Sequence, residues 1–542
     1  MHTALEPTSL GIGIDTGGTY TDVAIVDLST DTVLSTAKRP TTHHDLSIGI
    51  TQALDHAARH VPLTGNAIKR IALSTTLATN AIVEGQGADV GLLVIGRVKH
   101  FSSPVLGIRF IKGGHTITGE EAEPIDLETV VETIEDFRGH VQAYAVCAAM
   151  SFVNPAHEEV VRKAISLYDP RPVFCSHEIS TRAGMEERAQ TAVINARLLP
   201  LMKTFLAGVQ PPLKALAPEA DMRVLRGDGG FMSLHDAEQH AADTVSSGPA
   251  ATACFGASAC PTGMAAIVDV GGTTTDITLI RDGSPILQKD GSLIGGWHTH
   301  VQSVDMSTIG AGGDSRVRIT PDKDISLGPE RVVPLSLAEG FPAPDTWIGP
   351  GTRAVCIRAI KTDAGDPILS WLNAYGPATL EALICGTGLG EIPLSSRLDT
   401  LRHRQAVVET GFTPTDALHV LGRLDMGNTD RAANGAASIA AYSHTTPEGL
   451  SEQIIYTIEV MIEDAIIDHL MRYGFNASLN RSFPGYRNHP LLGVQFDVKI
   501  PLIGIGAASA HFLPAVAERL GTELRLPDHY AVGNALGAIR AK

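Results

Sequence analysis

The sequence predicts an α/β protein built from two related halves. A short pattern, Asp-x-Gly-Gly-Thr-x-Thr-Asp, occurs twice, at 15–22 and 269–276, each time between two apolar runs. The first half of the chain also alternates between β-rich runs and runs with helical periodicity. At 542 residues the chain exceeds the usual size of a single core, so we expect two or more domains.

Each copy of the pattern predicts a strand, a glycine turn and a second strand. Adjacent glycines let a tight turn adopt positive φ and bring backbone N–H groups against an anion, and threonine hydroxyls add donors. One such turn is often an ordinary hairpin, but two equivalents with the same flanking residues favour binding of the phosphates of ATP. The candidate phosphate-binding residues are Gly17, Gly18, Thr19, Gly271, Gly272 and Thr273.

An aspartate opens each turn, Asp15 in the first and Asp269 in the second. A carboxylate does not bind a phosphate directly because like charges repel, so its expected partner is a hydrated Mg²⁺ or an attacking water. We therefore expect Asp15 and Asp269 to be metal ligands and catalytic residues, one of them a candidate base. The alternative is that each aspartate caps its turn, and the same alternative applies to Asp22 and Asp276.

Regular elements are predicted along much of the chain. The hydroxyl-rich start of the segment 74–84 predicts either a helix N-terminus that faces a ligand or a capped core helix. An apolar stripe from Glu448 to Arg472 predicts a core helix that ends at Gly474. The other predicted strands lie near 11–15, 22–27, 70–74, 90–95, 143–152 and 172–175, and the other helices near 46–60, 126–137, 156–167, 185–206 and 511–520.

Prolines suggest where domains and loops lie. Pro200 is expected to break or kink the helix at 185–206, and Gln210-Pro211-Pro212 is expected to be a connector. The predicted domains are therefore 1–210 and 211–542. Six prolines between 321 and 350 exclude a long helix there, so this stretch is expected to be an exposed excursion, or a substrate or partner loop.

Near the end of the chain an apolar run enters a glycine turn at 500–509. Small residues at such a turn let a flat nucleoside approach the backbone. Gly504, Gly506 and Ala507 are therefore the candidate adenosine-binding residues. The signal is weak alone, but it follows two phosphate turns in the chain.

Composition narrows the possible partners. The net charge is −17 and no block of Lys or Arg stands out, so nucleic acid is not expected as a partner. The longest apolar run, 141–153, is too short for a membrane span, and the N-terminus lacks a signal pattern, so we expect a cytoplasmic protein with no membrane partner. The six cysteines lack Cys-x-x-Cys spacing, which indicates reduced core thiols. His298, His300 and Asp305 are a candidate substrate or metal cluster, although scattered loop polar residues are the preferred interpretation.

Several segments together resemble the hydantoinase A and 5-oxoprolinase family of the actin, sugar kinase and Hsp70 superfamily. The segments that carry the resemblance are both glycine turns, 74–84, 187–196, 247–251, 308–313, 412–416 and 421–424. The resemblance implies two duplicated actin-like (ribonuclease H-like) ATPase domains with a nucleotide cleft between them, which would bind ATP and Mg²⁺. It adds Gly312 and Gly313 to the candidate cofactor-binding residues. Asp314 departs from the family, which commonly has a glycine there.

The family implies ATP-dependent opening of a cyclic amide such as a hydantoin, 5-oxoproline or another lactam. The amide oxygen would be phosphorylated first. Three alternatives stay open on the sequence: the phosphorylating subunit of a related carboxylase, a small-molecule kinase, and an ATPase switch or reactivase. A hydantoinase B-type subunit and a second copy of the chain are the expected protein partners.

Overall fold

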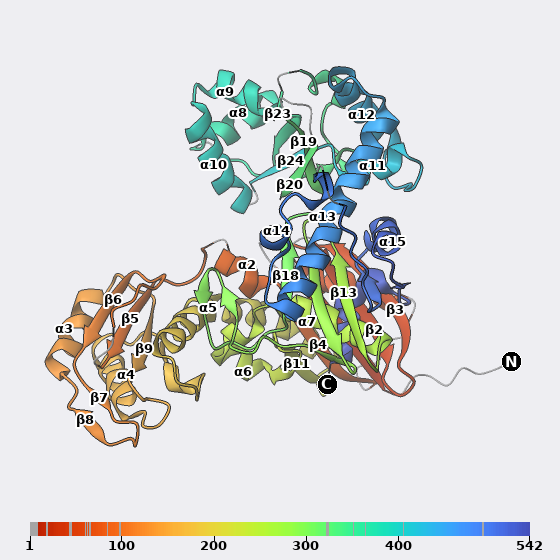
Figure 1. The fold of residues 1–542 in the computed structure, drawn as a ribbon. Helices are drawn as coiled ribbons and strands as arrows, with labels where there is room; N and C mark the ends of the chain where they lie inside the picture. The colour runs from red at the N-terminus through yellow and green to blue at the C-terminus, as the bar shows by residue number, and fades with distance from the viewer. Residues whose placement is uncertain are drawn as a thin grey trace. The chain divides into compact units, whose positions relative to one another are not determined.

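The computed structural model describes residues 9–541 except for a set of short gaps (Figure 1). The gaps are 18–19, 43–45, 60, 62, 64–66, 84, 97–98, 321–324, 351, 364, 405, 490 and 492. The chain forms two compact units, the first made of 1–263, 278–305 and 532–542 and the second of 264–277 and 306–531. Both combine helices with β-sheets, so the predicted α/β class is confirmed. Residue 210, where we placed a domain boundary, lies inside the first unit.

A six-stranded sheet in the first unit carries the first glycine turn. Its strand order is β12-β11-β4-β1-β2-β3. β1 pairs antiparallel with β2, directly across the turn, and parallel with β4. The strands are β1 (Leu10–Thr16), β2 (Tyr20–Asp27), β3 (Thr32–Pro40), β4 (Ile68–Thr75), β11 (Asp221–Leu225) and β12 (Phe231–Ser233). Because β1 is buried along its whole length, it reads as an apolar run in the sequence.

A second sheet of the first unit has the order β10-β9-β5-β6 and is entirely parallel. Helices α3 (Leu127–Phe137) and α4 (Ala156–Tyr168) lie beside it in Figure 1. Its strands are β5 (Val90–Ile95), β6 (Gly107–Ile111), β9 (Ala143–Ala148) and β10 (Val173–Cys175). The remaining elements of this unit are β7 (Gly114–His115), β8 (Glu121–Glu123), β15 (Ser284–Pro285), β16 (Leu293–Ile294), β17 (Trp297–His298), α1 (Leu46–Ala58), α2 (Leu77–Val83), α6 (Leu234–Gln239), α7 (Ser247–Ala259) and α16 (Gly533–Arg540).

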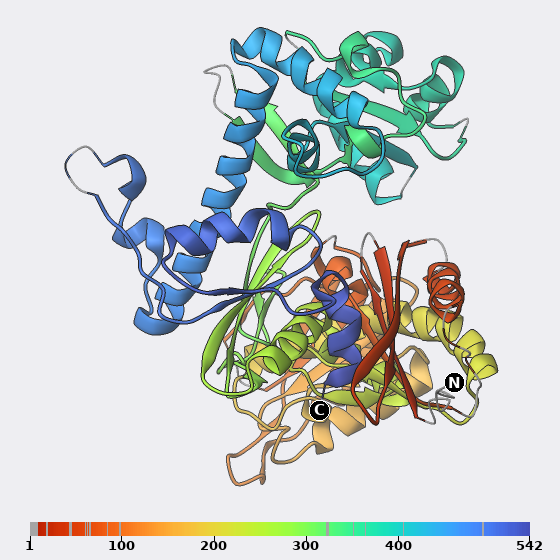
Figure 2. The same ribbon diagram turned by 90° about the vertical axis from the view of Figure 1, so that its right-hand side faces the viewer.

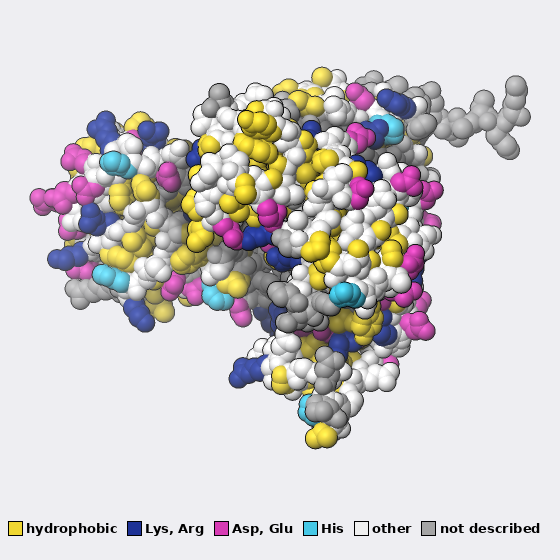
Figure 3. All heavy atoms as spheres, turned by 90° about the horizontal axis from the view of Figure 1, so that it is seen from above, with side chains coloured by type: hydrophobic (Ala, Val, Ile, Leu, Met, Phe, Trp, Pro, Cys, Tyr) yellow, Lys and Arg dark blue, Asp and Glu magenta, His cyan; other side chains and the backbone are white. Residues whose placement is uncertain are grey.

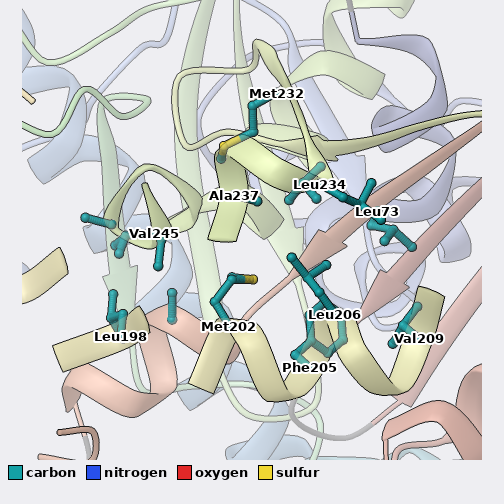
Figure 4. Packing of buried hydrophobic residues seen from close by; sticks show 14 of the residues in the cluster. Leu73, Leu198, Met202, Phe205, Leu206, Val209, Met232, Leu234, Ala237 and Val245 are labelled. Carbon is teal, nitrogen blue, oxygen red and sulfur yellow. The ribbon is translucent and has the colours of Figure 1, made fainter. Parts of the chain in front are cut away.

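The long helix α5 (Met185–Leu216) is the central helix of this core. Its residues Met202, Phe205 and Val209 point into a cluster that also holds Leu73 of β4 (Figure 4). By length and composition α5 could cross a membrane, but 61% of its most apolar window is buried inside the protein. The predicted connector at Gln210-Pro211-Pro212 is wrong, because the helix continues through these prolines. Burial of the flanking Val209 and Leu213 outweighs the lost backbone hydrogen bonds.

The second unit carries the second glycine turn, between β13 (Met264–Val270) and β14 (Thr275–Arg281). β13 pairs in parallel with β25 (Leu502–Ile505), and β25 pairs with β26 (Leu524–Arg525). Figure 2 shows, in light blue, the long helix α13 (Pro447–Phe475) rising toward the green and cyan elements at its other end. These and the other elements of the unit are β18 (Met306–Ile309), β19 (Ser315–Ile319), β20 (Ile325–Arg331), β21 (Val333–Pro334), β22 (Val355–Ala359), β23 (Ala378–Thr379), β24 (Val407–Gly411), α8 (Pro367–Tyr375), α9 (Leu380–Thr387), α10 (Glu391–His403), α11 (Pro414–Val420), α12 (Thr429–Ser443), α14 (Leu479–Ser482) and α15 (Ser509–Arg519).

The proline-rich stretch is only partly as expected. Its described part, 325–350, has no α-helix, which agrees with the prediction. However, it is not an exposed excursion, because Leu335, Phe341 and Trp347 are buried. Apolar side chains between the prolines pack inward, so prolines here shape the backbone of a packed segment rather than a free loop.

Most predicted elements are found within two or three residues of their expected limits. The strand expected at 143–152 is shorter, because β9 ends at Ala148 and Met150 adopts a positive φ of 57°. The helix expected to end at Gly474 ends at Phe475, where the left-handed Asn476 is the C-cap. All six cysteines are free and four of them are buried, as expected of reduced core thiols.

Candidate functional site

The two glycine turns have the same backbone hydrogen bond at equivalent positions. In the first turn Gly17 N donates to Tyr20 O at 3.0 Å, and in the second Gly271 N donates to Thr274 O at 2.9 Å. The predicted strand–turn–strand structure is therefore confirmed in both copies. Gly18 and Thr19 lie outside the described residues. Phosphate binding by the two turns stays a prediction.

Asp15 is a buried carboxylate at the end of β1, with only 3% of its surface exposed. Its Oδ1 accepts a hydrogen bond from Ser74 Oγ at 2.5 Å, and its Oδ2 accepts one from Asn534 Nδ2 at 3.4 Å. Burial raises the pKa of Asp15, and the hydrogen bonds from Ser74 and Asn534 oppose this shift. Thr252 Oγ1 in turn donates to Asn534 Oδ1 at 2.7 Å, which fixes the orientation of the amide.

Asn534 is a residue of this site that the sequence analysis missed. Close helix packing brings it there: an added Cβ on Gly13 would lie 1.9 Å from Ala535 O, and one on Gly537 would lie 1.8 Å from Ala251 O. Only glycine permits α16 to approach β1 and α7 this closely. The repeated glycines of β1 indicate that another element packs closely on this strand, but nothing in the sequence identifies that element as α16.

The hydroxyl-rich segment after β4 ties two helices to this strand end. Thr76 N donates to Thr16 O at 3.1 Å, so the start of α2 is fixed beside β1. Ser247 Oγ, at the start of α7, accepts from Thr75 N at 3.2 Å and donates to Thr75 O at 2.8 Å. Thr75 Oγ1 also accepts from the backbone N of Leu77, the first residue of α2. Helix α2 therefore begins at the Asp15 strand end, and whether its N-terminus faces a ligand stays a prediction.

Two further groups near Asp15 bear on ligand binding. Thr16 Oγ1 is buried and has no hydrogen-bond partner among the described residues, so it can bind an incoming polar group. Asp22 lies directly across the strand pair from Asp15, and Lys38 Nζ lies 2.8 Å from the Asp22 carboxylate. This lysine offsets the repulsion between two adjacent aspartates. On the face drawn in Figure 3, Lys and Arg side chains lie dispersed among Asp and Glu side chains.

The second turn is held by a backbone loop. Gly313 N donates to Gly271 O at 3.0 Å, and Asp314 N donates to Gly272 O at 2.7 Å. An added Cβ on Gly312 would lie 2.6 Å from the carbonyl oxygens of both Gly271 and Gly272. The family segment around Gly312 and Gly313 therefore packs directly against the second turn, which the resemblance did not specify.

Charged side chains complete the surroundings of this turn. Asp314, the residue that departs from the family, accepts hydrogen bonds from Arg331 Nε at 3.2 Å and Nη2 at 3.1 Å. Burial raises the pKa of Asp314 and the Arg331 guanidinium lowers it. Asp276 accepts from Thr308 Oγ1 at 2.6 Å, and loss of hydration raises the pKa of Asp276 to about 6.

The predicted adenosine turn follows β25 and lies beside Asp269. Gly506 has φ of 87°, and an added Cβ would lie 2.5 Å from Val270 O and 2.6 Å from Asp269 Oδ1. Gly504 is packed against Leu513 and Leu526, which by itself explains the absence of a side chain there. Ala507 is exposed. Adenosine binding by these residues stays a prediction.

The described residues do not bring His298, His300 and Asp305 together as a group of converging metal ligands, and a role of these residues in substrate binding stays a prediction. Among the described residues, the group whose ligand atoms lie within 4.8 Å of one another is Glu158, Cys175 and His177. The Glu158 carboxylate of this group already accepts four hydrogen bonds from within the protein. The donors are Ala148 N, Ser176 Oγ, His177 N and His177 Nδ1. We therefore interpret the group as a structural network.

The donors near Asp15 fit a phosphate ligand with a divalent cation. The Asp15 carboxylate offers about four acceptor positions and receives two described hydrogen bonds, so lone pairs remain for a hydrated cation. The Thr16 hydroxyl, which has no hydrogen-bond partner among the described residues, can donate to an anion beside it.

Comparison with known proteins assigns the family. Residues 188–542 match the hydantoinase/oxoprolinase family, and residues 11–168 match its N-terminal region. The chain belongs to the hydantoinase/oxoprolinase family. It is 27% identical over 460 residues to caprolactamase subunit alpha from Pseudomonas jessenii, which covers 75% of this chain and 64% of that protein. It is 28% identical over 426 residues to the acetophenone carboxylase gamma subunit from Aromatoleum aromaticum, covering 66% of this chain and 57% of that protein.

The fold is shared with a protein of known structure. The crystal structure of the ATP-dependent caprolactamase from P. jessenii superposes with a TM-score of 0.66 and 23% identity, over 98% of this chain and 70% of that one. At this identity the likeness establishes the fold alone. The chain spans 64% and 57% of the lengths of the two curated relatives named above.

Proposed function

We propose that this chain uses ATP to activate a cyclic amide for ring opening by phosphorylating the amide oxygen. The observation that carries the proposal is the buried Asp15 at the start of a glycine turn that is repeated, with the same backbone hydrogen bond, after Asp269. Family membership supports the substrate class, because one similar relative is named as a caprolactamase subunit. A neutral amide resists hydrolysis, so coupling to ATP supplies the driving force.

ATP, when bound, would supply the phosphoryl group that activates the amide carbon toward water; the ring C–N bond then breaks as the nitrogen takes a proton, and hydrolysis of the resulting acyl phosphate releases phosphate. The chain's own residues are proposed to bind the nucleotide and to orient the reacting groups. The N–H groups and hydroxyls of the two turns bind phosphates, and Asp15 and Asp269 hold Mg²⁺ or position water. Ser74 and Asn534 fix the Asp15 carboxylate in one orientation. Gly506, Ala507 and the loop at Gly312 are proposed to contact the nucleoside end.

The test is ATP hydrolysis by the purified chain, with Mg²⁺, against a panel of hydantoins, 5-oxoproline and lactams of different ring size. We expect at least one ring to stimulate turnover and to yield the opened amino acid. Asp15→Asn is expected to lower the stimulated rate by about tenfold to a hundredfold or more, because a ligand is lost. Asp136→Asn, an exposed change on α3, is the matched control. Full activity of Asp15→Asn, or turnover indifferent to every ring with and without a partner subunit, would sink the proposal.

A second function is favoured by one observation. The similarity to a carboxylase gamma subunit supports a phosphorylating subunit of a related carboxylase. In that case a ketone or bicarbonate, rather than a cyclic amide, would stimulate ATP hydrolysis. The same assay separates the remaining alternatives: a kinase accumulates a stable phosphorylated product, and an ATPase switch hydrolyses ATP slowly without a substrate.

The quaternary arrangement belongs to the proposal as well. Both curated relatives named above are subunits, which supports a partner chain of the hydantoinase B type. Size-exclusion chromatography with light scattering, with and without a co-expressed partner, distinguishes that complex from a homo-oligomer. A cytoplasmic location stays a prediction.

A further inference from the structure

A compact polar group lies at the start of α5, away from the glycine turns. Ser180 Oγ and His300 Nδ1 are 2.6 Å apart, and the backbone N of His300 donates to Thr191 Oγ1 at 2.8 Å. Ser180 is buried and the His300 ring is partly buried. The ring is therefore held at two points, by its own nitrogen and by its backbone, although it lies in a loop.

One tautomer of His300 makes it an acceptor toward Ser180 and a donor at its other ring nitrogen. Ser180 Oγ accepts from Arg182 N at 3.1 Å, so its own proton is available for His300 Nδ1. Nδ1 then accepts, and Nε2 carries the ring proton as a donor. Burial lowers the pKa of His300, which keeps the ring neutral at neutral pH. In this tautomer His300 Nε2–H is an uncharged donor.

An acceptor lies near this donor, beside the Gly184 backbone. The position of a Cβ added to the exposed Gly184 lies 2.7 Å from Glu187 Oε2 and 3.3 Å from His300 Nε2. The two groups therefore flank one point beside the Gly184 backbone. The Glu187 carboxylate has no hydrogen-bond partner among the described residues, so it is available to a ligand as an acceptor. A side chain at position 184 would collide with Glu187 Oε2.

This pair of groups is complementary to one edge of a cyclic amide. In a small ring the amide is held cis, so its N–H and its C=O point to the same side. Glu187 can accept from the ring N–H while His300 Nε2–H donates to the carbonyl oxygen. An N-substituted amide or a lactone satisfies only one of the two.

We propose that Glu187 and His300, with Ser180 as a positioning residue, bind the N–H and C=O edge of the cyclic amide substrate. The inference rests on the proposed function and adds the place and the two-point chemistry of recognition. The place of Glu187 and His300 in the first unit is consistent with activation of the amide near Asp15. Helix α2 packs on α5, and an added Cβ on Gly295, in the loop before His300, would lie 2.6 Å from Ile82 Cγ2 of α2. α2 begins beside Asp15 and has seven residues, a length of about 10 Å.

Isothermal titration calorimetry of the full chain tests the proposal with 2-pyrrolidinone, ε-caprolactam and hydantoin, each compared with its N-methyl derivative. Wild type should bind at least one parent ring about tenfold to a hundredfold more tightly than the N-methyl form, because a charged acceptor loses its partner. In Glu187→Ala this ratio should fall to within about twofold. His300→Phe should weaken the parent ring by about tenfold and leave ATP binding unchanged. The matched controls are Glu186→Ala, on an exposed neighbour, and His298→Phe.

A ratio in Glu187→Ala equal to that of wild type would overturn the proposal. Glu187 is also the third residue of α5, where a carboxylate favours the helix dipole. If that is its whole role, the variant melts earlier but keeps the N-methyl discrimination. Wild-type chain that binds none of the rings also overturns the inference. Ring-stimulated ATP hydrolysis in that case would leave the proposed function standing, so the two failures are distinguishable.

Discussion

Asn534→Asp is the sharpest perturbation of the buried carboxylate at the first turn. In the native protein the Asn534 amide donates to Asp15 Oδ2 at 3.4 Å. The substitution replaces this donor with a carboxylate oxygen at nearly the same place, while Thr252 Oγ1 can still donate to the other oxygen. Shape is conserved, so the change is almost purely electrostatic.

The size of the effect follows from that distance. Two unit charges at 3.4 Å repel by about 5 kcal/mol at an effective dielectric constant of 20. Repulsion of this size makes the pair share one proton near pH 7. The folded state then binds a proton that the unfolded chain releases, so stability is greatest at low pH and is lost as pH rises. Asn534→Ala only removes a donor, at about 1 to 2 kcal/mol.

Thermal unfolding at pH 5 and pH 8 measures the difference between the two variants. At pH 8 the melting temperature of Asn534→Asp should fall on the order of 10 °C below that of Asn534→Ala, and at pH 5 the gap should narrow to a few degrees. Asn434→Asp, an exposed position of α12, should show neither effect. An equal gap at both pH values would refute the assignment of Asn534 as the partner of Asp15.

Three further changes probe the second turn. Gly506→Ala should destabilise by about 2 kcal/mol or more and weaken ATP binding, because the residue has positive φ and its Cβ would clash with Asp269; calorimetry and nucleotide titration measure both. Asp276→Asn should raise stability on the order of 1 kcal/mol at pH 8 and not at pH 4, since a carboxyl whose pKa is raised to about 6 in the folded state costs stability that grows from about pH 4 to pH 6 and is full above that. Arg331→Met should destabilise by about 1 to 2 kcal/mol, more at pH 8 than at pH 4, because Asp314 loses its counter-charge; urea unfolding at both values checks the sign.

The local parts of the site could be predicted from the sequence. A glycine turn between two apolar strands is defined by adjacent residues, so both turns were found and both have the expected form. The helix at 448–472 could be predicted equally well from the sequence, because one apolar stripe defines it. Family membership also followed from ordered local segments.

The missed features depend on contacts that are distant in the sequence. Asn534 lies 519 residues from Asp15, and no periodicity links them. Proline at 211 and 212 normally ends a helix, yet core packing of α5 outweighs this preference. His300 was grouped with His298 by proximity in the sequence, whereas its partner Ser180 and the nearby Glu187 come from another segment.

The two turns have the same backbone hydrogen bond, but the groups around Asp15 differ from those around Asp269. This difference predicts different roles for the two aspartates. Asp15 is buried, receives side-chain hydrogen bonds and has a raised pKa, which suits a residue that accepts a proton or orders the attacking group. Asp269 is half-buried beside the backbone of Gly506, which suits a hydrated cation. Asp15→Asn should therefore lower kcat with little change in KM for ATP, and Asp269→Asn should chiefly raise KM. Steady-state kinetics at several Mg²⁺ concentrations separate the two, and excess Mg²⁺ should partly restore Asp269→Asn alone. The reverse pattern would assign the base to Asp269.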